Sequence, residues 1–298
     1  MKKVAFVTGA SSGIGAATAL RLNDAGYQVY AAARRVERMA SLEAAGIHVL
    51  SLDLTDPDSI TAAVRTVLAD GGRLDLLVNN AGYGSYGAIE DVPMAEARAQ
   101  FEVNVFGLAD LTRQVMPQMR AQRGGTIANI SSMGGKVVAP LGGWYHASKF
   151  ALEALSDALR MEARPFGIHV VVIEPGSVRS EWGRVAAEHL RSTARTSPYR
   201  AVAERVADHL AASSEPGSRT TSEPEVIART VVRVARATRP RTRYRTGFGA
   251  APLVFLRWLL PDRAIDSLVR RSFGVHQAPI PTADGPKTDN QDLETERG

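Results

Sequence analysis

The residues best suited to proton chemistry are Tyr145 and Lys149, in the run Tyr-His-Ala-Ser-Lys near the start of a predicted helix. A spacing of four residues places the phenol and the ammonium on one helix face, one turn apart. Because a nearby cation favours the phenolate, we expect Lys149 to lower the pKa of Tyr145 from its usual value of ~10 toward the range of a general acid or base. The alternative is a surface tyrosine and lysine, a common pair in any helix.

A glycine-rich loop from Thr8 to Gly15 lies between a predicted strand and a predicted helix. Glycines allow a tight turn and the close approach of a pyrophosphate, and a helix N-terminus directs N–H groups and a positive dipole end at the anion. The spacing is Gly-x-x-x-Gly-x-Gly, not the commonest dinucleotide fingerprint, so an ordinary strand-to-helix loop is the alternative. The predicted phosphate-binding residues are Gly9, Ser11, Ser12, Gly13, Ile14 and Gly15.

These residues need a scaffold, and the chain predicts one in which strands alternate with helices. The predicted strands cover residues 4–7, 28–33, 48–52, 74–78, 126–130 and 169–173. The predicted helices cover residues 15–24, 57–70, 96–119, 145–164 and 226–237. Pro117 should end or distort the last turn of the third helix. This alternation predicts an α/β fold with a single Rossmann-type doubly wound parallel sheet, flanked by helices on both faces.

The C-terminal part of the chain is less regular. We expect a catalytic domain over residues 1–250, in which residues 181–222 are a candidate substrate lid and residues 241–246 a last edge strand. Residues 251–276 form an amphipathic C-terminal segment. Residues 277–298 are polar and contain prolines, so we expect a disordered tail.

Composition narrows the class of protein further. The content of 45% hydrophobic and 22% charged residues is typical of a soluble globular protein. The chain has no cysteine, which excludes disulfides and thiolate nucleophiles, and we expect no metal site. We find neither a secretory leader nor a long apolar run, which favours the cytoplasm. Residues 222–276 hold eleven arginines against four acidic residues, a local charge of +7, but no recognition motif accompanies them and no nucleic-acid partner is expected.

Six sequence elements together resemble the classical short-chain dehydrogenase/reductase family. They occur in the family's order and approximate spacing, and they are Thr8 to Gly15, Asn79-Asn80-Ala81-Gly82, Asn104, Ser131-Ser132, Tyr145 with Lys149, and Pro175-Gly176. The resemblance covers residues 3 to about 180 well and continues loosely to about 250. It is greatest to the branch that includes hydroxysteroid and retinol dehydrogenases.

The resemblance implies a catalytic tetrad of Asn104, Ser132, Tyr145 and Lys149. Tyr145 would donate a proton to the substrate oxygen in the reductive direction, and Ser132 would hydrogen-bond the developing oxyanion. Ser132 is preferred to Ser131 because it lies thirteen residues before Tyr145, the usual family spacing. Lys149 would hold the nicotinamide ribose and lower the pKa of Tyr145. Asn104 would hold a water near Lys149 or would be a structural amide that satisfies backbone groups.

The resemblance also implies cofactor contacts beyond the glycine loop. Asp53 would accept a hydrogen bond from the adenine amine, although an aspartate that caps its own loop is an equal alternative. Ser180 stands where the family usually has a threonine that contacts the carboxamide. The implied contacts are Asp53, Leu54, Asn80, Ala81, Gly82, Tyr145, Lys149, Pro175, Gly176, Val178 and Ser180.

The end of the second predicted strand favours NADP(H) over NAD(H). NAD-selective sites usually have an acidic residue at this position, and here it is Ala33. Arg34 and Arg35 follow, and a guanidinium can pair with the 2′-phosphate of NADP(H), helped by the hydroxyl of Ser11 or Ser12. The alternative is a solvated pair of loop arginines.

Apolar residues flank the predicted site and favour a hydrophobic substrate. They are Met133, Val138, Leu141 and Trp144 before Tyr145, and Trp182, Val185, Leu190, Tyr199 and Val202 in the candidate lid. Core or interface packing is the usual alternative for such residues. The basic, apolar run 251–273 is expected to close the cleft or form an interface, with peripheral membrane contact as the less favoured reading.

We therefore expect an NADP(H)-dependent oxidoreductase acting on a steroid-like, retinoid-like or 3-oxoacyl-like alcohol, ketone or aldehyde. The family's habit predicts a homodimer or homotetramer. A cofactor-sensing binding protein is one alternative, although such sensors commonly lack the Tyr and Lys pair. An isomerase or dehydratase of the extended branch is the other.

Overall fold

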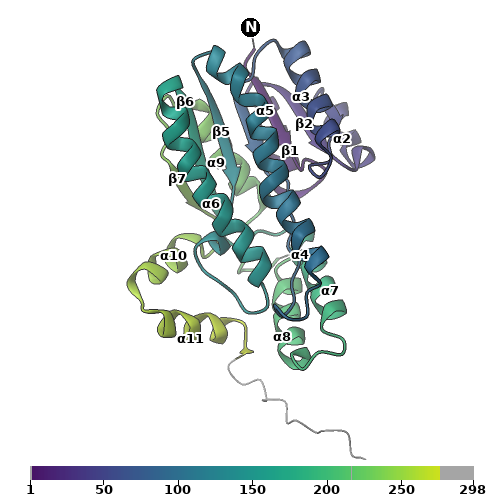
Figure 1. The fold of residues 1–298 in the computed structure, drawn as a ribbon, viewed down its shortest axis with the longest axis vertical. Helices are drawn as coiled ribbons and strands as arrows, with labels where there is room; N and C mark the ends of the chain where they lie inside the picture. Colours follow the sequence, from purple (N-terminus) through teal and green to yellow (C-terminus); the bar gives the residue numbers. More distant parts are fainter. Residues whose placement is uncertain (1, 216, 276–298) are drawn as a thin grey trace, which may run out of the picture.

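A single seven-stranded sheet forms the centre of the protein (Figure 1), whose computed structural model describes residues 2–215 and 217–275. The strand order is β3-β2-β1-β4-β5-β6-β7, and all neighbouring strands are parallel. The strands are β1 (Val4–Thr8), β2 (Gln28–Ala33), β3 (His48–Ser51), β4 (Leu76–Asn79), β5 (Gly125–Ile130), β6 (Ile168–Pro175) and β7 (Arg243–Thr246). The predicted Rossmann-type doubly wound sheet is confirmed, and β7 is the edge strand expected near residues 241–246.

Helices cover both faces of the sheet because successive strand residues point to opposite sides. In β1, Ala5 and Val7 belong to the core under α1 and α9, whereas Val4 and Phe6 belong to the core under α3, α5 and α6. Figure 1 shows α5 and α6 in front of the sheet and α9 behind it. These helices are α1 (Gly13–Asp24), α3 (Pro57–Gly71), α5 (Leu108–Ala121), α6 (Gly143–Ala163) and α9 (Pro224–Arg236).

The ends of α3 follow the signals in the sequence. The Asp56 carboxylate accepts from the Asp58 N–H at 3.0 Å, and Pro57 occupies the first turn. Gly72 ends the helix in the left-handed conformation with φ 65°. An N-cap acid, an early proline and a C-terminal glycine are local signals, so this helix was predictable from its own residues.

The long helix expected over residues 96–119 is divided. Its parts are α4 (Met94–Phe101), the π-helical turn η2 (Glu102–Gly107) and α5. Pro117 does not end it, because the core contacts of Leu111, Val115 and Met119 hold α5 in place as far as Ala121. At the π turn the backbone of Gly107 passes so close to Leu54 that a Cβ would lie 2.0 Å from the Leu54 carbonyl oxygen. The π turn therefore ends where the backbone of Gly107 packs closely against the loop after β3.

The range 181–222 is more regular than the sequence suggested. It contains α7 (Glu181–Thr193) and α8 (Arg200–Ala212), which pack against each other through Ala186, Leu190 and Val206. Both helices expose long charged side chains, which masked their apolar stripes. The segment from Val36 to Ala44, for which we predicted no helix, forms η1 (Val36–Met39) and α2 (Ala40–Ala44).

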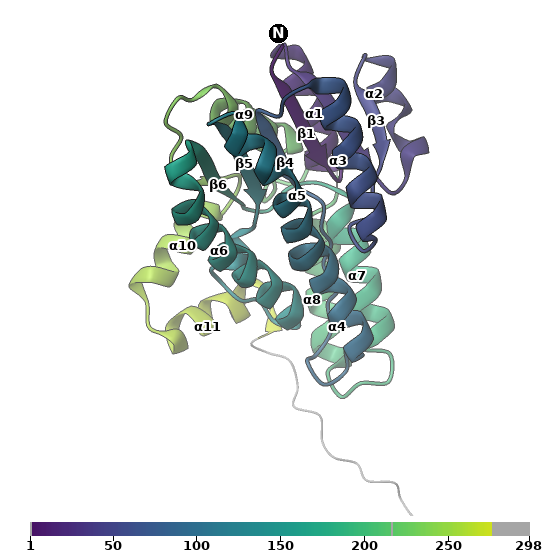
Figure 2. The same cartoon turned by 45° about the horizontal axis from the view of Figure 1, so that its top comes forward.

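The C-terminal segment forms two helices instead of one amphipathic run, and they are α10 (Ala250–Leu259) and α11 (Asp262–Ser272). Figures 1 and 2 both place them, with α7 and α8, at one end of the sheet. Within residues 2–215 and 217–275, no helix has the length and apolar character of a membrane span. The tail predicted over 277–298 lies outside the described residues, and the limits of the expected domains stay predictions.

Candidate active site

The glycine loop folds into a cradle whose backbone leaves no room for side chains. Gly9 has φ 67°, and a Cβ on it would lie 2.8 Å from the Cα of Ala81. A Cβ on Gly15 would lie 2.3 Å from the carbonyl oxygen of Gly9. Ser12 is the N-cap of α1, but no side chain caps this helix end in the described structure. The N-terminal N–H groups of α1 are thus presented at a narrow backbone turn, which is the arrangement that binds an anion.

The two asparagines after β4 hold the loop and the sheet. The Asn80 side-chain amide donates to the carbonyl oxygens of Thr8 at 3.0 Å and Gly9 at 3.2 Å. The buried Asn79 amide donates to Asn129 at 2.9 Å and to Thr112 at 3.0 Å. Asn79 therefore stabilises the sheet, whereas Asn80 shapes the glycine loop.

Tyr145 lies in the first turn of α6, inside an aromatic wall that we define as Tyr86 and Trp182. The ring centroids of these residues lie 5.9 and 5.1 Å from that of Tyr145, which is only 8% exposed. Burial raises the pKa of Tyr145, and a hydrogen bond with the Ser132 hydroxyl opposes this shift in part. The expectation that Lys149 would lower the pKa of Tyr145 is wrong for this structure, because desolvation disfavours the phenolate more than its surroundings stabilise it.

Lys149 is also buried, and its ammonium donates to the carbonyl oxygen of Ile130 at 3.0 Å. Burial lowers the pKa of Lys149 to about 8, while the negative charge of Glu153 acts in the opposite direction. Glu153 is four residues further along α6 and was not among the predicted site residues. Lys149 therefore stays charged at neutral pH and would lose its proton in mildly alkaline solution.

Ser132 and Asn104 approach the site from two other elements. The Ser132 oxygen accepts from the Gly134 N–H at 2.9 Å, whereas the buried Ser131 hydroxyl has no partner in the described structure. The Asn104 amide, presented by the π turn, donates to the Tyr83 carbonyl at 2.9 Å and accepts from the Tyr83 N–H at 3.1 Å. Asn104 therefore makes the contacts of a structural amide, which was the alternative prediction, and it holds the loop after β4 in place.

Asn104 nevertheless lies beside Lys149. A Cβ on Gly82 would lie 2.9 Å from the Asn104 oxygen and 3.7 Å from the Lys149 nitrogen. Gly82 is thus required where the loop, the π turn and α6 meet. The structure brings all four residues of the predicted tetrad to one end of the sheet.

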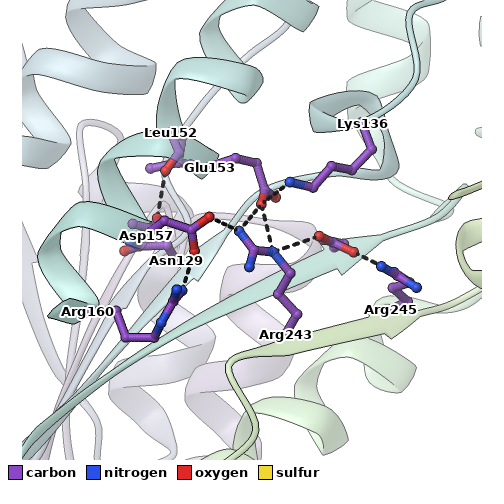
Figure 3. A network of polar contacts seen from close by, with 10 residues as sticks. Asn129, Lys136, Leu152, Glu153, Asp157, Arg160, Arg243 and Arg245 are labelled. Atoms are coloured by element: carbon purple, nitrogen blue, oxygen red, sulfur yellow. Dashed lines mark hydrogen bonds and ion pairs between the residues drawn. The ribbon is translucent and has the colours of Figure 1, made fainter. Parts of the chain in front are cut away.

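An ion network joins Glu153 and Asp157 on α6 to β6 and β7 (Figure 3). The side chains of Glu153 and Glu174 are 4% and 0% exposed, and Arg243 contacts their carboxylates at 3.1 and 3.3 Å. Four further pairs complete it, and they join Lys136 to Glu153 at 3.0 Å, Arg245 to Glu174 at 3.0 Å, Arg243 to Asp157 at 2.6 Å and Arg160 to Asp157. The network ties the helix that carries Tyr145 to the edge of the sheet.

The remaining predicted cofactor contacts fall into two groups. Ser180 caps α7 by accepting from the Trp182 N–H at 3.3 Å, and its Cβ would lie 3.4 Å from a Cβ on Gly13. Pro175 ends β6 and Gly176 and Val178 follow it; Val178 packs in the same core as Ile14 of the glycine loop, whereas a Cβ on Gly176 would lie 1.9 Å from the Phe248 carbonyl oxygen. Asp53 accepts from the Thr55 N–H at 2.9 Å and the Thr55 hydroxyl at 2.8 Å, which is the loop-capping alternative.

Arg34 and Arg35 lie exposed immediately after β2. Sequence reasoning missed the next arginine along, Arg38, whose guanidinium donates to both Glu181 oxygens at 3.0 and 2.7 Å. This pair joins the segment after β2 to the start of α7. It therefore connects the region expected to read the 2′-phosphate with the candidate lid.

The aromatic wall was predicted only in part. Trp182 and Leu141 do pack beside Tyr145, whereas Leu190 packs inside the α7 and α8 pair. Tyr86 gave no signal, because a tyrosine in a loop shows no periodicity. His146 is structural, since its ring accepts from the Ala139 N–H at 3.0 Å and contacts the Gly134 carbonyl at 2.9 Å.

A nicotinamide dinucleotide fits these residues. The glycine cradle and the uncapped start of α1 suit a pyrophosphate, and Lys149, Ser180 and Tyr145 lie beyond it at the same end of the sheet. Within the described part of the chain, no three His, Asp or Glu side chains are grouped as metal ligands would be.

Comparisons with known proteins agree with this geometry. The family described as short chain dehydrogenase matches residues 3–190. The uncharacterized oxidoreductase YusZ of Bacillus subtilis is 36% identical over 280 residues, which are 91% of this chain and 98% of the relative. The 3-ketodihydrosphingosine reductase of Bacteroides thetaiotaomicron is 40% identical over 174 residues, which are 58% of this chain and 63% of the relative.

Solved structures give the same result. A short-chain dehydrogenase from Streptomyces avermitilis superposes with a TM-score of 0.73 at 34% identity, covering 92% of this chain and 98% of the other. A metagenomic short-chain oxidoreductase in complex with NADP superposes with a TM-score of 0.63 at 33% identity, covering 81% and 95%. The protein belongs to the short-chain dehydrogenase family and is an oxidoreductase of the NAD(P)-binding Rossmann type.

Proposed function

We propose that the protein is an NADP(H)-dependent oxidoreductase that transfers a hydride between nicotinamide and a hydrophobic alcohol, ketone or aldehyde. The observation that carries this proposal is the buried Tyr145 phenol, which lies near the Ser132 hydroxyl and is enclosed by Tyr86 and Trp182. A nicotinamide, when bound, supplies or accepts the hydride. The residues of the chain supply the proton and the shape of the site.

In this proposal Tyr145 is the acid in the reductive direction. Because burial keeps the phenol protonated, Tyr145 can donate its proton to the substrate oxygen as negative charge develops there. Ser132 donates a second hydrogen bond to the same oxygen. Lys149, one turn further along the same helix face, would hold the nicotinamide ribose, as the family resemblance implies.

The substrate class follows from the surface around the phenol. The rings of Tyr86 and Trp182 and the partly buried Leu141 form an apolar surface beside Tyr145. Such a surface favours a ketone or alcohol on a hydrocarbon frame of the steroid, retinoid or 3-oxoacyl kind. A relative named as a 3-ketodihydrosphingosine reductase supports a keto group on a long chain.

The preference for NADP(H) rests on Arg34 and Arg35, which are exposed after a β2 that ends in Ala33. No carboxylate ends β2, and the neighbouring Glu181 is engaged by Arg38. An arginine here can form a charge-assisted hydrogen bond with a 2′-phosphate. The NADP-bound relative is consistent with this choice.

The test measures oxidation of NADPH and of NADH against hydrophobic ketones, aldehydes and 3-oxoacyl thioesters. We expect turnover with NADPH, and Arg34→Ala should raise the KM for NADPH by about 10-fold to 100-fold while leaving that for NADH nearly unchanged. Arg65→Ala, an exposed arginine of α3, is the matched control. A wild-type preference for NADH would refute the cofactor assignment, and no turnover with any carbonyl compound would refute the function.

A further inference from the structure

Helix α10 is apolar on two opposite faces. Its inner face, with Leu253, Val254 and Leu256, packs toward Val137 and α11. Its outer face carries Phe255, Trp258 and Leu259, which are 54%, 79% and 58% exposed. These three residues and the exposed Ala251 recur at the spacing of a single helix stripe. A surface helix normally turns a polar face outward, so the outer stripe of α10 requires an apolar environment.

Positive charge lies next to this stripe. The neighbouring helix α11 exposes Arg263, Arg270 and Arg271, and none of them forms an ion pair within the described part of the chain. A cavity of about 420 Å³ beside α10 is lined by Val254, Phe255 and Trp258 and by three cations that are paired with carboxylates, Lys136, Arg245 and Arg257. Aromatic and aliphatic side chains beside arginines are the combination that binds the surface of an anionic bilayer.

We propose that the outer stripe of α10, defined as Ala251, Phe255, Trp258 and Leu259, docks on an anionic phospholipid surface. The apolar side chains enter the boundary between headgroups and acyl chains, and the arginines of α11 attract the lipid phosphates. Trp258 is suited to this position because its ring is apolar and its indole N–H needs a polar partner.

The size of the stripe favours a lipid surface over a second copy of the chain. Three large side chains that are about half to four-fifths exposed offer on the order of 400 Å². A stable dimer buries about 800 Å² on each partner. Helix α10 has 10 residues, against about 20 for a membrane span, so it lies along the surface without crossing it.

Docking would bring the active site to the lipid. The inner faces of α10 and α11 pack on Val137 and Ala139, in the loop that follows Ser132. Beyond α11, Phe273 and Val275 pack against the α7 and α8 pair. If the proposed function is right, an apolar substrate would reach Tyr145 from the bilayer; the docking itself does not depend on that function.

The experiment is flotation of the full chain with vesicles of phosphatidylcholine alone or mixed with phosphatidylglycerol. We expect binding to the mixed vesicles that weakens by about 10-fold or more in the double variant Phe255→Ser with Trp258→Ser. The double variant Arg270→Gln with Arg271→Gln should weaken binding at low salt by a similar factor. Met161→Ser is the matched control, because Met161 is 68% exposed on α6, away from the stripe.

Thermal unfolding of each variant, followed by circular dichroism, shows whether it is folded, and these surface changes should leave the midpoint nearly unchanged. Equal binding to both kinds of vesicle, or full binding by the Phe255 and Trp258 variant, would overturn the proposal. So would a vesicle-independent dimer that the same variant abolishes, since a second copy would then cover the stripe. Because no substrate is used, an inactive enzyme would leave this test intact.

Discussion

The first two turns of α6 and the turns that follow differ in whether their titratable side chains form ion pairs. One face of this helix carries Tyr145, Lys149, Glu153 and Asp157 at successive intervals of four residues. Tyr145 and Lys149 are buried without a charged partner in direct contact. Burial raises the pKa of Tyr145 and lowers that of Lys149, so it favours the neutral form of each. Glu153 and Asp157 are held by Arg243 at 3.1 and 2.6 Å.

The difference teaches what charged partners do along one helix face, on which Lys149 is buried and the side chain of Asp157 is 38% exposed. Hydrogen bonds from Arg243 and Arg160 hold the pKa of Asp157 below its usual value even though desolvation acts against them. Lys149 has only a carbonyl oxygen as a direct partner, so its pKa falls to about 8. The same helix face therefore has a titratable half suited to proton transfer and an ionic half suited to anchoring.

The largest expected effect comes from the titratable half. Tyr145→Phe removes the proton donor while keeping the ring between Tyr86 and Trp182, so NADPH-dependent turnover should fall by about 10²-fold to 10⁴-fold. Cofactor binding, followed by fluorescence titration, should change little. Retained turnover would show that the buried phenol is not the acid, and the two halves of α6 would then differ in environment but not in role.

Arg243→Met should affect stability far more than it affects proton transfer. Glu153 and Glu174 would be left buried with fewer cations, so the free energy of unfolding should fall by about 3–5 kcal/mol. Urea unfolding measures this change. The matched control is Arg191→Met, which also removes an arginine bound to two carboxylates, but at a site where its side chain is 37% exposed.

Exposed ion pairs contribute about 1 kcal/mol or less, so Arg191→Met should be nearly neutral. Equal losses from the Arg243 and Arg191 variants would mean that burial of the network contributes nothing extra. The ionic half of α6 would then be an ordinary set of surface salt bridges.

The smallest expected effect is a shift in the pH dependence of activity, in which Glu153 of the ionic half acts on Lys149 of the titratable half. Lys149 is charged below a pKa of about 8 and loses its charge as the pH rises through that value, so reductive activity should fall on the alkaline side. The carboxylate of Glu153 raises the pKa of Lys149, and Glu153→Gln should therefore move the alkaline limb to lower pH by on the order of one unit. The measurement is kcat/KM for NADPH oxidation as a function of pH.

Asp157→Asn is the control for Glu153→Gln, because it removes another carboxylate from the same arginine one turn further from Lys149. Its pH profile should match that of the wild type. If both variants shift the limb equally, the effect comes from a disturbed helix and not from the charge of Glu153.

The parts of the molecule that sequence predicted well are those whose signals are local. The pair Tyr145 and Lys149 lies within five residues, and the glycine loop within eight. The caps of α3 are equally local. Each of these patterns restricts the backbone or the side-chain geometry by itself, so the helix, the turn and the alternating strands could be assigned before any tertiary contact was known.

The parts that sequence reasoning missed depend on distant partners. Arg38 and Glu181 are 143 residues apart, and Arg243 and Glu153 are 90 residues apart, yet each pair is in direct contact. The π turn at Asn104 ends at Gly107, which approaches Leu54, a residue distant in the sequence. Charged residues on α7 and α8 hid two regular helices, because their apolar stripes are stabilised by each other and by residues distant in the sequence, such as Tyr86 and Val275.

The sequence by itself determined the family, the parallel sheet and the identity of Tyr145 and Lys149, because short spacings and strand periodicity are properties of the local chain. Only the tertiary structure decided how those two residues titrate. Tyr86, Trp182 and Ser132, which surround the Tyr145 phenol, come from three other elements, and a pKa depends on all the groups that surround an atom. The outer stripe of α10 was likewise visible as composition, but its exposure became known only when the fold showed which face was left uncovered.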